Sequence, residues 1–155
     1  MSQSGKNVSV SDIFQKEDSR MNSGTFINNQ WVTRSFNTII GNAPVRLNDN
    51  NIFTLQPGTY LIRARLPAFS VGKHQARLFN VTTKQVVKYG SSEIAPLGFQ
   101  TSSEIIYFTG KMNKVNRFKV EHQVELLQIS NGLGVASNFS QSEQIYGEVE
   151  VLKLD

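Results

Sequence analysis

Cysteine is absent from this sequence of 155 residues. Its absence excludes disulfide bonds, thiolate metal sites and a cysteine nucleophile, and it leaves the redox state of the compartment open. No run of about 18 apolar residues occurs, so we expect no insertion into a membrane. Residues 1–6 are mostly polar. For that reason we expect neither a signal peptide nor secretion by the standard route.

Charged side chains are also scarce, at 18% of the residues, and the net charge is only +4. Polarity comes instead from Asn, Gln, Ser and Thr, a composition typical of twisted sheets with solvated outer faces. The small net charge permits an acidic partner without requiring one. The length fits one domain that buries enough surface to fold without a metal or a disulfide.

Alternation of apolar and polar residues predicts β-strands along most of the chain. It is clearest over residues 118–126, where Phe, Val, His, Val and Leu alternate with Lys, Glu, Gln and Glu, and it recurs over residues 60–66. Further strands are expected near residues 31–40, 51–55, 74–82, 85–92, 103–110, 133–138 and 144–154. The pattern predicts an all-β fold, an antiparallel jelly-roll sandwich of about nine or ten strands.

The first 25 residues are rich in Ser, Asn and Asp and differ from the rest of the chain. We expect them to form a polar N-terminal arm, followed by the jelly-roll domain over residues 26–155. Residues 11–17 carry the cap signal of a helical turn. The arm is expected to anchor the domain to a larger protein or a neighbouring subunit, with packing on its own domain as the alternative. The anchor residues would be its apolar cluster, Val8, Val10, Ile13 and Phe14.

Residues able to support catalysis are few. His74 and His122 are the only histidines, and no nucleophile-elbow sequence accompanies them, so a serine triad is not expected. His122 shares a strand face with apolar residues, and we interpret it as a hydrogen-bonded core residue rather than a ligand. Glu148 and Glu150 share a face only because they are two residues apart. The sequence therefore predicts a protein that is not an enzyme and that holds no cofactor and no metal.

Two loop sequences match binding motifs only in part. Residues 131–137 contain G-x-G but lack the third glycine and the helix of a dinucleotide fingerprint, so we expect a turn and a crowded strand there. Asn48-Asp49-Asn50-Asn51 is rich in oxygen but has one carboxylate where calcium loops supply several. We therefore prefer an Asx turn and keep calcium as the alternative.

Basic residues are scattered, with Lys111, Lys114, Arg117 and Lys119 expected along one hairpin and Arg63 and Arg65 in a second patch; we call these six residues the basic face. Nucleic-acid sites usually combine denser basic clusters with exposed aromatic side chains. The spacing here suits solvent or an acidic partner instead, and nucleic acid is not expected as a partner.

Three stretches, in order, resemble a known family. Residues 52–62 read Ile-Phe-Thr-Leu-Gln-Pro-Gly-Thr-Tyr-Leu-Ile and resemble the third-strand signature of the tumour-necrosis-factor-like superfamily, which includes the globular heads of the first complement component. Residues 105–110 and 145–152 resemble its sixth and closing strands. Residues 58–62, 73–80 and 132–139 also resemble jelly-roll modules of bacteriophage structural proteins.

The resemblance implies a compact homotrimer with an interface at Leu61, Arg63, Tyr107 and Tyr146, the two tyrosines lying near the three-fold axis. Both tyrosines filling the domain's own core is the alternative. The resemblance further implies a non-enzymatic virion structural protein assembled in the host cytoplasm, a capsid decoration (cement) protein or a fibre-head module. Its partners would be itself and a major capsid or other virion protein. The alternative is a recognition module of the same fold that binds a receptor or a host surface glycan.

Overall fold

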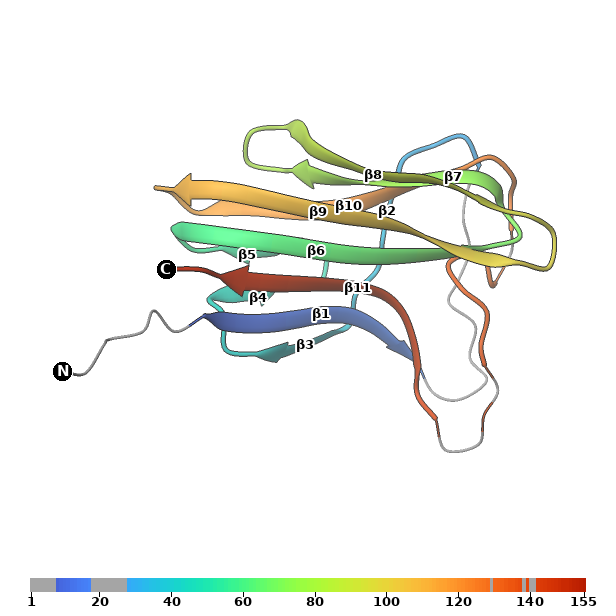
Figure 1. Ribbon diagram of the computed structural model, residues 1–155, viewed down its shortest axis with the longest axis horizontal. Coiled ribbons are helices and arrows are strands. Elements are labelled where there is room, and N and C mark those ends of the chain that lie inside the picture. The colour runs from blue at the N-terminus through green and yellow to red at the C-terminus, as the bar shows by residue number, and fades with distance from the viewer. Residues whose placement is uncertain (1–7, 18–27, 129, 138, 140–141) are drawn as a thin grey trace.

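The computed structural model describes residues 8–17, 28–128, 130–137, 139 and 142–155, which form two packed β-sheets (Figure 1). Eleven strands are described: β1 (Ser9–Glu17), β2 (Val32–Thr33), β3 (Thr38–Gly41), β4 (Val45–Leu47), β5 (Phe53–Leu55), β6 (Gly58–Phe69), β7 (Gly72–Asn80), β8 (Gln85–Ala95), β9 (Gln100–Met112), β10 (Asn116–Val124) and β11 (Gln144–Lys153). Among the residues described, no helix is long and apolar enough to cross a bilayer.

All strand pairs that the structure describes are antiparallel. The five-stranded sheet has the order β3-β1-β11-β6-β9, and the six-stranded sheet has the order β4-β5-β10-β7-β8 with β2 paired to β10. Strands far apart in sequence are neighbours in both sheets, as in a jelly roll (Figure 1). The predicted fold class is therefore confirmed, with one or two more strands than expected.

The core lies between the two sheets because each long strand turns one face inward. On β6, Tyr60, Ile62 and Leu66 are fully buried, while Arg63 points outward. On β10, Phe118, Val120 and Val124 are buried in core clusters that also contain residues of the opposite sheet, in line with the alternation in the sequence. Each large apolar side chain removed from water in this way contributes about 1.5–3 kcal/mol.

The prediction of an N-terminal arm is wrong over residues 9–17, because these residues form the strand β1. This strand lies inside the five-stranded sheet, hydrogen-bonded to β11 on one side and to β3 on the other. Ile13 is 0% exposed and belongs to the main core. Residues 9–17 are thus part of the jelly roll and form no helical turn, because two neighbouring strands satisfy their backbone groups. The remaining residues of the expected arm, 1–7 and 18–25, lie outside the described part.

Two loop predictions have different outcomes. The oxygen-rich loop is an Asx turn, as preferred, since Asn48 Oδ1 accepts hydrogen bonds from the backbone N–H of Asn50 (2.9 Å) and Ile52 (3.1 Å). The strand expected at residues 133–138 is wrong over its described part, where residues 133–137 have no regular pairing. Gly134 there has φ +142° and lies against Tyr146, where an added Cβ would be 2.4 Å from the ring.

Candidate binding surfaces

The outward side chains of the five-stranded sheet form three rows across its strands, which we call the sheet face. The first row contains Val10, Leu152, Leu61 and Phe108. The second contains Ile40, Asp12, Glu150, Arg63 and Ile106. The third contains Thr38, Phe14, Glu148, Arg65 and Glu104. The first row is wholly apolar, and the second has an apolar side chain at each end.

Several apolar side chains of the sheet face are open to solvent. Ile106 is 63% exposed, Phe108 is 60% exposed and Ile40 is 58% exposed, and Val10 is also exposed. They are joined across the sheet by Leu61 of the first row, which is half-buried. Contiguous exposed apolar side chains of this size are typical of a surface that contacts another protein.

Both arginines of the sheet face are paired with glutamates of the same chain. Arg63 donates to Glu150, with 3.0 Å from Nε to Oε1, and Arg65 Nη2 lies 3.5 Å from Glu148 Oε2. Burial raises the pKa of Asp12 to about 7, helped by a hydrogen bond to Glu148 and the negative charge of that residue. Near neutral pH this carboxyl group is therefore partly protonated, and the centre of the face carries little net charge.

Leu61 and Arg63, two of the four residues predicted for the trimer interface, lie on the sheet face. Tyr107 and Tyr146 do not, which favours the alternative that both fill the domain's own core. Tyr107 alternates with its exposed neighbours on β9 and packs against the main core. Tyr146 is buried beneath Gly134, because a bulge where β11 meets β1 lets it keep facing inward.

Sequence reasoning missed Ile106 and Phe108 as surface residues. A signal existed, since residues 105–108 read Ile-Ile-Tyr-Phe, and a strand that is apolar on both faces is usually covered on both faces.

The two patches of the predicted basic face are divided between the two sheets. Arg63 and Arg65 lie on the five-stranded sheet, whereas Arg117 and Lys119 point outward from β10 in the opposite layer. Lys119 Nζ also lies 3.4 Å from Glu121 Oε2. Of the rest, Lys111 lies near the end of β9 and Lys114 in the turn that follows.

The four predicted anchor residues also lie apart. Val8 and Val10 are exposed, but Ile13 and Phe14 are buried, so the four cannot act as one anchor. Ile13 in particular belongs to the core of its own domain.

A different apolar surface occurs where three connections meet at one end of the sandwich. We call it the loop end, consisting of Leu97, Phe99, Leu126, Leu127 and Val135. Leu97 is 87% exposed and Phe99 is 66% exposed. Backbone bonds join the connections, since Ser70 N–H donates to the Phe99 carbonyl (3.1 Å) and Leu126 N–H donates to the Val71 carbonyl (2.9 Å). The exposed side chains therefore stand on a fixed base.

His122 is a hydrogen-bonded core residue, as predicted, and it is 0% exposed. Its Nδ1 lies 3.2 Å from Arg34 Nη1, and its Nε2 lies 2.8 Å from His74 Nδ1. His74 Nε2 lies 2.7 Å from Thr101 Oγ1, and that hydroxyl donates to the Ile94 carbonyl at 3.0 Å. Arg34 was not singled out by the sequence, although it is among the largest fully buried side chains.

Arg34, at one end of this hydrogen-bond chain, determines which atom donates and which accepts in each bond. The guanidinium of Arg34 only donates, so Nδ1 of His122 accepts and its Nε2 carries the proton. Nδ1 of His74 then accepts in turn, and its Nε2 donates to Thr101. Both rings are thereby held neutral, and both ring nitrogens of each are used. Among the residues described, no group of three or more His, Cys, Asp or Glu side chains is arranged to hold a metal ion.

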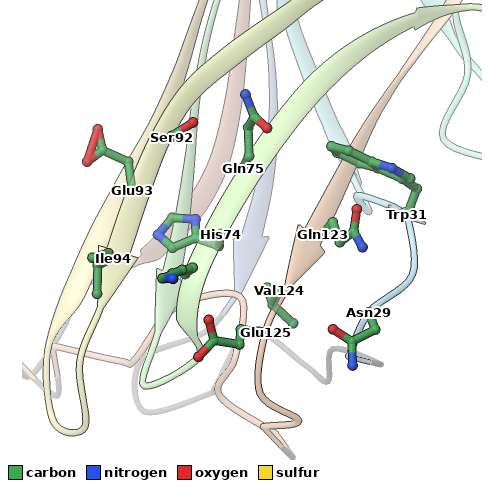
Figure 2. A pocket seen from close by; sticks show the side chains of 11 residues that line it. Asn29, Trp31, His74, Gln75, Ser92, Glu93, Ile94, Gln123, Val124 and Glu125 are labelled. Carbon is green, nitrogen blue, oxygen red and sulfur yellow. The ribbon is translucent and has the colours of Figure 1, made fainter.

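A groove of about 760 Å³ crosses the outer side of the six-stranded sheet (Figure 2). Its wall includes a polar row formed by Ser92 of β8, Gln75 of β7 and Gln123 of β10, which are paired across the strands. Trp31, just ahead of β2, lines the groove beside this row. The guanidinium carbon of Arg77 lies 4.0 Å from the centre of the Trp31 ring system.

Comparison of the whole fold finds similar solved structures. Murine APRIL at pH 8.0 has a TM-score of 0.57 at 12% identity, covering 96% of this chain and 100% of that chain. The globular domain of zebrafish complement 1qA protein has a TM-score of 0.58 at 11% identity, covering 95% and 98%. Eiger TNF from S. frugiperda has a TM-score of 0.56 at 11% identity, covering 96% and 94%. No family model and no curated protein matches the sequence.

The similar structures extend over almost the whole chain, and they belong to the superfamily that the motifs of residues 52–62, 105–110 and 145–152 suggested, with tumour-necrosis-factor-like and complement globular-head structures among them. The chain therefore has the jelly-roll fold of tumour necrosis factor and of the complement globular heads. Identities of 11–12% establish the fold alone.

Proposed function

We propose that this protein is a non-enzymatic virion structural protein that assembles as a homotrimer through its sheet face. The observation that carries the proposal is the apolar row of Val10, Leu152, Leu61 and Phe108, flanked by the exposed Ile106. In a closed three-fold assembly, a neighbouring subunit covers this face on each of the three subunits, so none of the three faces stays exposed to water. The fold supports the same proposal, since the families it resembles assemble as trimers.

The internal charge pairs of the sheet face favour association with identical copies. Arg63 and Glu150 neutralise one another on the same subunit, so a partner need not supply a counter-charge. Burying a charge that is already paired costs far less than burying an isolated one. The partner surface can then be as apolar as the face itself.

The virion role rests on the resemblance of residues 58–62, 73–80 and 132–139 to bacteriophage jelly-roll modules. In this proposal the trimer is a capsid decoration protein or a fibre head, assembled in the host cytoplasm. Because Ile13 is buried in its own core, we assign attachment to the particle to the loop end instead of the N-terminal segment. Leu97 and Phe99 are its most exposed apolar side chains, and the major capsid or another virion protein is the partner.

Light scattering of the purified chain tests the assembly. The expected mass is three times 17.4 kDa, and Phe108→Asp is expected to yield monomers because the new carboxylate would be buried without a partner. Leu97→Asp is the matched control, since it adds the same charge on the loop end and should leave the trimer intact. A monomeric parent chain, or a trimer that tolerates Phe108→Asp, contradicts the proposed interface.

Sedimentation of gradient-purified virus particles tests the virion role. The chain should travel with the particles, and Leu97→Asp should release it as a free trimer. Particles that lack the chain refute the virion role while leaving the trimer standing. Particles that keep the Leu97→Asp variant refute the assignment of attachment to the loop end.

A further inference from the structure

The groove on the six-stranded sheet has the composition of a site for uncharged, hydroxyl-rich ligands. Three amide side chains, from Asn29, Gln75 and Gln123, line it together with the hydroxyl of Ser92. Each amide both donates and accepts, which matches hydroxyl groups that do the same. A volume of about 760 Å³ also falls within the range of about 300–1,000 Å³ for small-ligand sites.

The charges in the groove disfavour an anionic ligand. The groove is lined by one ammonium group, from Lys73, and by two carboxylates, from Glu93 and Glu125. Phosphate and sulfate groups are recognised by an excess of cationic donors, which this groove lacks. Carboxylates accept hydrogen bonds from hydroxyl groups, so the same side chains that repel an anion suit a neutral saccharide.

Trp31 is held in a fixed orientation beside the amide row. Arg77 packs over its ring system at 4.0 Å, and Arg77 is itself fixed by Glu121, with 2.9 Å between Nη2 and Oε1. Tyr89 contacts the indole as well, with ring centres 6.1 Å apart. A rigid, amphipathic ring of this kind binds a partner at small entropic cost.

Gln75 is also held in place before any ligand binds. Its Nε2 donates to the Gly90 carbonyl at 2.9 Å, which leaves the side-chain oxygen to accept from a ligand. Figure 2 presents Gln75 and Gln123 between Ser92 on one side and Trp31 on the other, along the groove. A pyranose whose apolar face stacks on the indole would bring its ring hydroxyls to the amide row.

We propose that this groove binds a neutral oligosaccharide, with Trp31 stacking on one sugar ring and Gln75 and Gln123 bonding to its hydroxyl groups. The groove lies on the layer opposite the sheet face, so the site does not depend on how the subunits associate. If the proposed trimer forms, it presents three such sites outward, and their combined affinity for a many-branched glycan rises well above that of one site.

The chain reports on this site directly, because Trp31 is its only tryptophan. Maltohexaose, chitohexaose and mannohexaose are titrated in turn while Trp31 fluorescence is followed, with dextran sulfate as the polyanionic comparison. At least one neutral hexasaccharide should give a saturable change below about 10 mM, a weak single-site affinity. Dextran sulfate should give none.

Two substitutions assign the binding to the groove. Gln75→Ala should weaken binding of the responding hexasaccharide about tenfold, as expected when one bonded polar side chain is lost. Gln85→Ala is the matched control, because Gln85 is an exposed glutamine of β8 outside the groove. Calorimetry repeats the titration with Trp31→Leu, which removes the fluorophore and should abolish the heat of binding.

Three results would overturn the proposal. The first is a panel in which none of the three neutral sugars changes the fluorescence. The second is equal affinity in the Gln75→Ala and Gln85→Ala variants, which would move the binding elsewhere. The third is dextran sulfate binding as tightly as the neutral sugars, which would make the groove a charge-driven surface. A monomeric chain that still binds the hexasaccharide would contradict the trimer and leave this site intact.

Discussion

Acid is expected to destabilise the protein through its buried histidines. Burial, and then the charges of Arg34 and His74, lower the pKa of His122 well below 6.5. Burial, and then the charge of Arg34, lower the pKa of His74 from 6.5 to about 4. Between pH 6.5 and about 4 the unfolded chain therefore binds protons that the folded chain does not. The free energy of unfolding falls as the pH falls through this window.

The size of the effect can be worked out for His74, whose pKa is about 4 in the folded chain. At about pH 5 the histidine of the unfolded chain is protonated, and keeping the folded ring neutral costs about 1.36 kcal/mol for each unit between that pH and the ordinary pKa, or about 2 kcal/mol. His122, whose pKa is lowered in the same direction, adds to this loss. Against a total stability of about 5–15 kcal/mol, this loss is readily measured.

Glutamine at position 122 separates titration from packing. Its carbonyl oxygen can accept from Arg34 and its amide can donate to His74, so the direction of the hydrogen-bond chain is kept. Urea unfolding at one fixed protein concentration, followed by Trp31 fluorescence, is compared at about pH 7 and pH 5. The parent chain should lose more free energy of unfolding than His122→Gln between the two conditions, by up to about 2 kcal/mol. An equal loss in both proteins would refute the reasoning.

Three further outcomes follow from the fold. Deleting residues 1–17 should unfold the chain, seen as lost β-sheet signal in circular dichroism, because β1 is an inner strand; a folded truncated domain would contradict this. Gly134→Ala should cost about 1–3 kcal/mol more in urea unfolding than Gly98→Ala, since both have positive φ but only the first meets Tyr146. Asp12 acts in the opposite direction to the histidines, so the melting temperature of the parent relative to that of Asp12→Asn should fall as the pH rises from about 4 to about 7; parallel profiles would exclude this role.

Strands with a regular pattern were predictable, and β1 shows why others were not. On β6 every inward residue is apolar, so alternation alone identifies the strand. On β1 the inward positions are Ser11, Ile13 and Gln15, two of them polar. Ser11 is satisfied inside the protein because its hydroxyl accepts from the Ala43 N–H at 2.9 Å. A strand whose inward polar groups find distant partners has no local signature.

The site residues also divide into those that the sequence could predict and those that it could not. Leu61 and Arg63 were assigned to an interface, and strand parity does bring both to the sheet face. Parity also turns Tyr107 inward, a consequence of its position between Ile106 and Phe108 that the sequence already contained. Arg34 was not predictable, because it bonds Pro67, His122 and Leu133, which lie 33, 88 and 99 residues along the chain. Only the folded topology brings these groups together.

The two layers of the sandwich are suited to different partners because their outward charges are used differently. On the five-stranded sheet, Arg63 is bonded to Glu150 within the chain, and the exposed side chains of Ile106 and Phe108 are apolar, so their removal from water is favourable. On the six-stranded sheet, the outward amides and carboxylates line a groove that is stable only when water or a ligand satisfies them. If a protein covered the groove, these amides and carboxylates would lose their hydrogen bonds to water. Covering the sheet face costs fewer hydrogen bonds, because Arg63 is already bonded within the chain. Assembly through the first layer and ligand binding through the second are therefore compatible on one fold.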